Sequence, residues 1–286
     1  PGVFAERGSN FIVQSSDLII AVGTRLPYMV TGYNSKDFGR NAKIVVVDID
    51  KNELRNNQVK AHTKIIEDAN TFLKLLYQNL SLKKFNEFEI KSWNKYCTSI
   101  RKKYPILLKS QVIQKKFVNS YYFVTKLSDY LKKKSQVITD MGLSFVGTHQ
   151  AFKIKKGQRL FTNSGHAPMG WGLPAAIGAY YASKKKRIIC LTGEGGLQLN
   201  VQELATVMHN KLPIKIFIYN NGGYLTIKQT QQLGFNSRIM GSNSKSGLSF
   251  PNYKDLAKSH KINYTSIAKG KNLKLKIKQI LKGTKP

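Results

Sequence analysis

Two side chains with oxygen atoms stand beside glycines in a pattern that suits a metal-bound diphosphate. Glu194 lies in the run 193–196 (GEGG), and Asn221 ends a pair of asparagines further along the chain. Carboxylate and amide oxygens are ligands for a hard cation such as Mg²⁺. Glycine backbone can approach a ligand closely, and the N–H groups at the start of a helix favour a phosphate. The pattern predicts a diphosphate held with Mg²⁺, although an ordinary tight turn also uses such glycines.

The segments around these residues predict a parallel βαβ unit. Residues 187–192 and 214–219 are short apolar runs, typical of buried strands. Between them, residues 201–209 carry apolar side chains at a helical spacing, and Pro213 follows that helix. The apolar positions are Val201, Leu204, Ala205 and Met208. Because parallel sheets bind ligands at the carboxyl ends of their strands, the glycine run and the asparagine pair are expected at one edge.

The rest of the chain predicts two α/β regions separated by a less regular stretch. The expected fold class is α/β, with parallel-sheet, three-layer α/β/α domains. The predicted domains are residues 1–80, a connector at 81–117, and residues 118–286. The other predicted elements are strands at 18–22, 42–47 and 137–140, helices at 51–56, 63–80, 120–133, 253–260 and 273–281, a helix with Pro174 in its first turn, a mobile polar loop at 222–249 and an edge segment at 262–267.

The net charge of +32 comes mostly from lysines spread along the chain. They stand near predicted element ends or on polar faces, without a zinc-finger, RNA-recognition or basic-zipper pattern. We therefore expect a solvated surface that attracts anionic substrates, and no nucleic-acid partner.

The sequence contains no apolar run of about 18 residues, so we expect no membrane-spanning helix. Two distant cysteines favour a reducing cytoplasm, and a first residue other than Met indicates that the chain begins inside a longer protein.

Four segments, in family order, resemble the acetolactate synthase large subunit of the thiamine-diphosphate-dependent enzymes. Residues 193–195 (GEG), the next 24 residues and the asparagine pair resemble the family motif GDG followed by NN. Residues 164–179 (SGHAPMGWGLPAAIGA) resemble the stretch SGGLGAMGFGLPAAIGA. Residues 7–26 and 42–54 resemble the end of the family's central domain. The resemblance implies part of a Rossmann-like central domain at 1–80 and a thiamine-diphosphate-binding fold at 118–286.

The resemblance also implies roles for individual residues of this chain. Glu194, Asn221 and the Gly223 carbonyl oxygen are the implied Mg²⁺ ligands. Met169 and His166 are the implied catalytic residues, because the Met169 side chain would force the bent shape of the cofactor and His166 would touch the substrate. The implied cofactor-binding residues are Gly142, Leu143, Ser144, Ala167, Met169, Gly193, Gly195, Gly196, Asn221 and Gly223.

Several departures from the family pattern bear on these roles. Glu194 stands where the family has the shorter Asp, and Mg²⁺ demands near-ideal geometry, so weaker metal affinity is expected. Thr226 and Thr230 replace bulky residues, which predicts a different substrate pocket. The family's FAD positions correspond to Gly23, Arg25 and Asp48, but residues 26–28 (LPY) stand in place of the usual acidic pair, so FAD is allowed rather than favoured.

The implied activity is thiamine-diphosphate- and Mg²⁺-dependent decarboxylation of a pyruvate-like 2-keto acid with carboligation, by a transferase or lyase that is a homodimer or tetramer. The family's pyrimidine domain, which carries the glutamate that protonates the cofactor, is expected from a partner subunit or from missing sequence. The chain alone is therefore expected to be inactive. A decarboxylase or carboligase for another 2-keto acid and an inactive cofactor-binding fragment are the alternatives.

Overall fold

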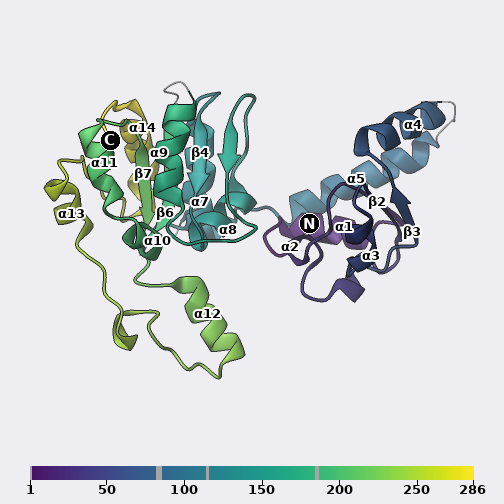
Figure 1. Cartoon of the computed structure of the whole chain (residues 1–286), viewed down its shortest axis with the longest axis horizontal. Helices are drawn as coiled ribbons and strands as arrows, with labels where there is room; N and C mark the ends of the chain where they lie inside the picture. The colour runs from purple at the N-terminus through teal and green to yellow at the C-terminus, as the bar shows by residue number, and fades with distance from the viewer. Residues whose placement is uncertain (1, 82–85, 114–115, 184–186) are drawn as a thin grey trace. The chain divides into compact units, whose positions relative to one another are not determined.

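The computed structural model describes residues 2–81, 86–113, 116–183 and 187–286. The chain divides into two compact units, Pro1–Ile106 and Leu107–Pro286 (Figure 1). Each unit contains one parallel sheet with helices around it, so the predicted α/β class is confirmed.

The first unit is built on a three-stranded parallel sheet in the order β1-β2-β3. Its central strand contributes Ile44 and Val46 to a core that also contains Ala21 and Leu54. β1 and α3 begin and end at the predicted residues. The elements are β1 (Leu18–Val22), β2 (Lys43–Asp48), β3 (Thr63–Ile66), α1 (Arg7–Gln14), α2 (Tyr28–Thr31), η1 (Ser35–Asp37), α3 (Lys51–Asn56), α4 (Ala69–Ser81) and α5 (Glu87–Lys103).

The helix predicted at 63–80 is wrong over its first residues, which form strand β3. Thr63 pairs with Val45 in a parallel register, and the strand continues to Ile66. Threonine and isoleucine are branched at Cβ and fit a pleated sheet well, so a neighbouring strand decides their conformation. The helix starts only after Asp68, whose carboxylate accepts hydrogen bonds from the backbone of residues 70 and 71.

The second unit is built on a four-stranded parallel sheet in the order β5-β4-β6-β7. Side chains of β4 and β6 are fully buried, as expected for inner strands covered on both faces. The strands are β4 (Gln136–Thr139), β5 (Arg159–Phe161), β6 (Ile188–Gly193) and β7 (Lys215–Tyr219). The helices are α6 (Lys109–Val112), α7 (Ser120–Tyr130), α8 (Leu143–Ala151), α9 (Gly172–Ala182), α10 (Glu194–Leu199), α11 (Glu203–His209), α12 (Leu225–Gly234), η2 (Ser244–Ser246), α13 (Tyr253–Ser259), η3 (Gly270–Asn272) and α14 (Leu273–Lys282).

Four expectations for this unit need correction. The glycine run, predicted as a turn between strand and helix, includes the first turn of helix α10, because β6 leads straight into the helix. The polar stretch 222–249 contains helix α12, which stands away from the sheet (Figure 1). Residues 262–267 form no strand. The buried face of α11 consists of Leu204 and Val207, whereas Ala205 and Met208 are exposed.

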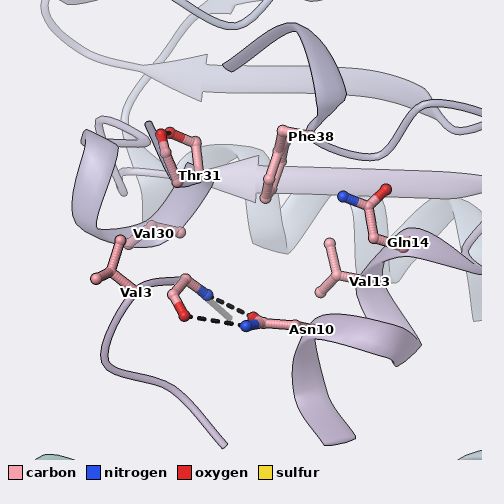
Figure 2. Close-up of a pocket in the computed structure, with 9 residues that line it drawn as sticks. Val3, Asn10, Val13, Gln14, Val30, Thr31 and Phe38 are labelled. Atoms are coloured by element: carbon pink, nitrogen blue, oxygen red, sulfur yellow. Dashed lines mark hydrogen bonds between the residues drawn. The ribbon is translucent and has the colours of Figure 1, made fainter. Parts of the chain in front are cut away.

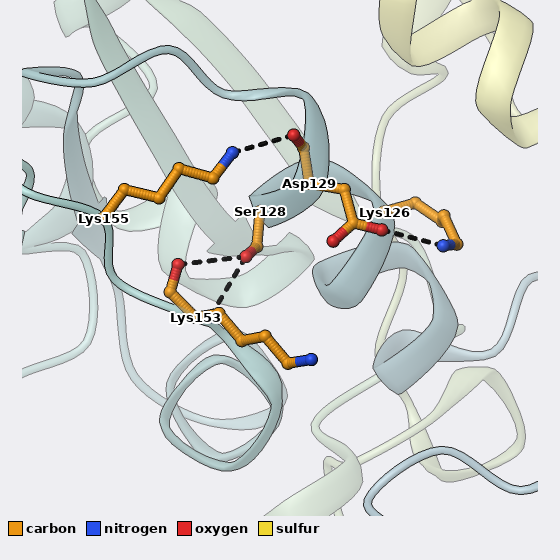
Figure 3. Close-up of polar contacts among 5 residues, drawn as sticks. All are labelled: Lys126, Ser128, Asp129, Lys153 and Lys155. Carbon is orange, nitrogen blue, oxygen red and sulfur yellow. Dashed lines mark hydrogen bonds and ion pairs between the residues drawn. The ribbon is translucent and has the colours of Figure 1, made fainter.

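One lysine side chain, that of Lys155, caps the end of a helix. Lys155 donates a hydrogen bond at 2.8 Å to the carbonyl oxygen of Asp129, near the end of α7 (Figure 3). It donates another, also at 2.8 Å, to the carbonyl oxygen of Leu131. Ser128 holds the same loop through the backbone of Lys153. A cation at a helix C-terminus satisfies free carbonyl groups and opposes the helix dipole. At this lysine, the excess charge therefore has a local structural use.

Substitution of Leu127 by alanine is expected to destabilise the second unit by about 3 kcal/mol, because the side chain is fully buried under the sheet. Leu275→Ala is the matched control, since Leu275 is mostly exposed, and it should change stability by less than about 0.5 kcal/mol. Trp171 fluorescence during urea unfolding, in a Trp93→Phe background, reports on the second unit alone. Equal effects of the two substitutions would contradict the described core.

Candidate cofactor and metal site

Three neighbouring strand ends bring most of the predicted site residues to one edge of the second sheet. β4, β6 and β7 are parallel and adjacent. The segments that continue from their carboxyl ends are 140–144, 193–196 and 220–223. Helices α8 and α10 both start at this edge, and Figure 1 shows α12 beyond it. Free N–H groups at helix starts favour an anion, so the edge has the general character of a phosphate site.

Glu194 is the first residue of α10 and is only 3% exposed. Its Oε2 atom accepts hydrogen bonds from three successive backbone N–H groups, of Asn221 at 2.8 Å, Gly222 at 3.0 Å and Gly223 at 3.3 Å. Oε1 accepts a fourth from Gly222 at 3.1 Å. Charge-assisted bonds of this kind are stronger than neutral ones. The longer side chain thus ties the start of α10 to the segment after β7.

Asn221 and Gly223 complete a cluster of polar atoms around this carboxylate. One end of the Asn221 amide lies 3.1 Å from Glu194 Oε2 and 2.6 Å from the Gly223 carbonyl oxygen. With its nitrogen there, the amide donates to both oxygens. With its oxygen there, the amide places a third oxygen beside Glu194 Oε2 and the Gly223 carbonyl oxygen, and a cation would stabilise such a set. A carboxylate, an amide oxygen and a carbonyl oxygen are ligand types that Mg²⁺ accepts, so the residues present fit the metal.

Over the described residues, no group of three or more His, Cys, Asp or Glu side chains could hold a metal ion. The candidate metal position is the mixed oxygen set at Glu194, because its ligand types suit Mg²⁺. Oε2 is the carboxylate oxygen of this set, and it already accepts hydrogen bonds from three backbone N–H groups, which would compete with a metal ion. Competition with these amides is a physical reason to expect the weaker metal affinity predicted for Glu194.

The glycines at this edge fall into two kinds. A Cβ on Gly195 would overlap the ring of Tyr224, and one on Gly196 would overlap Oδ2 of Asp140. These two positions are glycine because other parts of the protein pack on them. By contrast, no described atom lies within 4 Å of a Cβ placed on Gly193 or Gly222. Only the second kind leaves the Cα side of the backbone open to a ligand.

The predicted residues 142–144 begin helix α8. Gly142 has φ of +78°, a conformation that favours glycine, and its added Cβ would meet only Thr226 Oγ1, at 4.0 Å. The Ser144 hydroxyl is turned inward and donates to the carbonyl oxygens of Asp140 and Met141, both at 3.1 Å. Ser144 and Leu143 can therefore offer a phosphate their backbone N–H groups at the helix start, while the Ser144 hydroxyl is already in use.

The segment before α9 carries Ala167, Met169 and His166. Ala167 has φ of +51°, which is unusual for a residue with a Cβ, and its N–H donates to the Asn163 carbonyl oxygen at 2.9 Å. Strained backbone of this kind clusters at functional sites. Met169 is 36% exposed although it precedes fully packed residues, and His166 is exposed. The two side chains are thus accessible to a bound molecule.

Asp140, Thr192 and Tyr224 also lie at this edge, although the sequence predicted no role for them. Asp140 follows β4 and is 1% exposed. It accepts hydrogen bonds from Gly170 N and from the Thr192 hydroxyl, at 3.0 and 2.9 Å. The only available signal was the position of Asp140 directly after a predicted strand, where parallel sheets bind ligands. No local sequence pattern predicts which other segments of the chain form hydrogen bonds with Asp140.

The Tyr253 hydroxyl is buried without a hydrogen-bond partner among the described residues. Burial raises the pKa of this hydroxyl, and the charges of Glu194 and Tyr224 raise it further. Because an unsatisfied buried polar atom costs roughly 1 kcal/mol, Tyr253→Phe should raise the unfolding free energy by about that amount. Denaturant unfolding measures the change, with exposed Tyr264→Phe as the control. A destabilised Tyr253→Phe variant would show that the hydroxyl has a partner, such as an ordered water.

The residues matched to family FAD positions lie in the first unit. Gly23 and Asp48 stand at the ends of neighbouring strands, and Arg25 pairs with Glu53 at 3.5 Å. A cavity of about 250 Å³ in this unit is lined by other residues, among them Asn10, Gln14 and Phe38 (Figure 2). None of the three matched residues lines that cavity, so it lends no support to a flavin site.

Comparison with known proteins assigns the chain to a family. Residues 140–286 match the family model "Thiamine pyrophosphate enzyme, C-terminal TPP binding domain". The chain belongs to the thiamine pyrophosphate enzyme family. Residues 1–76 match the model of the same family's central domain. The predicted resemblance is thereby confirmed, and the parallel sheet of the second unit is the framework of a thiamine pyrophosphate-binding domain.

Curated relatives of this thiamine pyrophosphate enzyme chain are acetolactate synthase large subunits. The chain is 33% identical to that of Cyanidium caldarium over 282 residues, which is 98% of this chain and 47% of the relative. It is 32% identical over 250 residues to the isozyme 2 large subunit of Escherichia coli (strain K12), covering 83% of this chain and 41% of the relative. The chain spans about half the length of the curated relatives it matches. No helix in the described ranges is long and apolar enough to cross a membrane.

Proposed function

We propose that this chain binds thiamine diphosphate with Mg²⁺ and serves the decarboxylation of a pyruvate-like 2-keto acid followed by carboligation, as in acetolactate synthase. The observation that carries the proposal is the convergence of the Glu194 carboxylate, the Asn221 amide and the Gly223 carbonyl oxygen at the start of α10. Family membership and the names of the relatives support the substrate class and an oligomeric enzyme, for which a homodimer or tetramer is our expectation.

Each group of residues has a proposed part. Glu194, Asn221 and Gly223 would hold Mg²⁺, and the open backbone at Gly193 and the helix starts at 142–144 and 194–196 would hold the diphosphate. Ala167 and Met169 would place the aminopyrimidine end, with His166 toward the substrate. When bound, thiamine diphosphate supplies the electron sink that allows a 2-keto acid to lose carbon dioxide. The residues of the protein would bind thiamine diphosphate, orient it and shield it from water.

A second candidate is the same chemistry on a 2-keto acid other than pyruvate. Thr226 and Thr230 lie one turn apart on α12, and Thr226 Oγ1 faces the open side of Gly142. Threonines at these positions leave more room near the proposed cofactor than bulky residues would. Product analysis with pyruvate and with longer 2-keto acids separates the two candidates, since a preference for the longer acids would favour the second.

Calorimetric titration tests the cofactor assignment. Thiamine diphosphate should bind in the presence of Mg²⁺, and removal of the metal by a chelator should weaken that binding strongly. Glu194→Asp shortens the proposed ligand to the family's length and is expected to tighten Mg²⁺ binding. If neither the chain nor its Glu194→Asp variant binds thiamine diphosphate with Mg²⁺, the proposed function is wrong.

A further inference from the structure

Asp140 is a buried carboxylate at which three separate segments of the second unit meet. Oδ1 accepts hydrogen bonds from Met141 N at 2.8 Å and Gly170 N at 3.0 Å. Oδ2 accepts from the Thr192 hydroxyl at 2.9 Å and again from Gly170 N at 3.2 Å. The donors belong to the start of α8, to the segment before α9 and to the end of β6.

Two helices, α9 and α10, also approach Asp140 at positions without side chains. A Cβ on Gly172 would lie 2.9 Å from the Asp140 Cβ atom, and one on Gly196 would lie 2.9 Å from the Asp140 Cγ atom. Both distances are far shorter than a carbon contact allows, so only glycine fits. Backbone from α9 and α10 therefore packs directly on this one carboxyl group.

Burying a carboxyl group costs more free energy than burying a neutral side chain, so holding the segments together does not by itself explain an aspartate here. No ion pair in the described parts of the chain involves Asp140. Burial raises the pKa of its carboxyl above the ordinary value, and the hydrogen bonds from Met141, Thr192 and Gly170 offset part of that rise. A raised pKa stabilises the fold at low pH, and that contribution is lost as the pH rises through the folded-state pKa. At neutral pH a neutral residue of the same shape would be less costly.

We propose that Asp140 is a positioning residue that sets the separation between the two ends of the thiamine diphosphate site. Met141 leads into the proposed diphosphate loop, Gly170 follows Met169 of the aminopyrimidine segment, and Thr192 precedes Gly193. A single rigid group that bonds all three fixes the distance between them. The inference rests on the proposed function, because it assumes that both ends of one cofactor lie along these segments.

The test compares a two-ended ligand with a one-ended ligand. Asp140→Asn keeps one acceptor oxygen, and with it the bonds from Met141 and Gly170, but loses the second acceptor. Its affinity for thiamine diphosphate with Mg²⁺ should fall at least about tenfold. This is the lower end of the affinity loss caused by mutating residues that orient ligand-binding groups without touching the ligand. Its affinity for inorganic diphosphate with Mg²⁺, which does not span the site, should change less than about threefold, and its melting temperature at pH 7 should not fall.

The outcomes separate the two claims. If the unmodified chain binds neither ligand, the proposed function fails. If the unmodified chain binds both and Asp140→Asn loses both equally or neither, the positioning role is wrong. Should Asp140→Asn not fold, Thr192→Val removes one bond to Asp140 while keeping the side-chain shape. It should show the same selective loss for thiamine diphosphate, and an unselective loss or none would overturn the inference.

Discussion

Glu194→Gln is expected to lower the Mg²⁺ affinity of this chain on the order of 100-fold, measured as the Mg²⁺ midpoint of thiamine diphosphate binding. The amide has nearly the shape of the carboxylate, and its oxygen can still accept hydrogen bonds from the backbone of residues 221–223. It lacks the negative charge that would balance a bound cation. Removal of one member of a buried charge pair costs about 3 kcal/mol, which corresponds to about two decades in a binding constant.

The control for this variant is Glu203→Gln, on the next helix. Glu203 accepts a hydrogen bond from the Thr206 hydroxyl at 2.8 Å and has no place in the oxygen cluster at Glu194. Its substitution should leave the Mg²⁺ midpoint unchanged, and circular dichroism should show both variants folded. A Glu194→Gln variant with an unchanged midpoint would remove Glu194 from the metal site and leave the thiamine diphosphate assignment to the other residues.

Gly196→Ala is expected to destabilise the second unit by about 3 kcal/mol, at the upper end of the usual cost of overpacking. The new methyl group would overlap Oδ2 of Asp140 and lie 2.9 Å from the Thr192 hydroxyl oxygen. Neither neighbour can move freely, because each is fully buried and bonded to the other at 2.9 Å. Helix propensity favours alanine, so the whole loss would come from the clash.

Gly178→Ala is the matched control for this prediction. Gly178 also lies within a helix, α9, but no described atom is within 4 Å of its added Cβ. Alanine should there stabilise the unit by about 1 kcal/mol, the difference in helix propensity. Urea unfolding followed by Trp171 in the Trp93→Phe background measures both changes. Effects of the same sign would show that the packing around Gly196 is not as described.

Gly178 and Gly196 also show the limit of what a local sequence pattern can predict. Both glycines lie in motifs shared with the family, and the sequence offered no way to tell them apart. Gly178 faces open space, so close packing is not the reason for a glycine there. Gly195 was expected to make room for a diphosphate, yet the ring of Tyr224 occupies the space beside its Cα atom. A glycine shows only that a side chain is excluded, and the nearest excluding residue is distant in sequence: Tyr224 at Gly195 and Asp140 at Gly196.

The sequence alone determined the family, the α/β class, the bounds of β1 and α3, and the strand ends that meet at one edge of the second sheet. These features depend on hydrophobic runs and motifs that are local in the chain. It misread residues 63–66, because sheet pairing overrode a helical spacing. Tertiary structure alone decided that Glu194 reaches the backbone of residues 221–223 and that Asp140 joins three segments. Such contacts join residues 27 to 52 positions apart, and burial with satisfied hydrogen bonds, which no local pattern records, selects them.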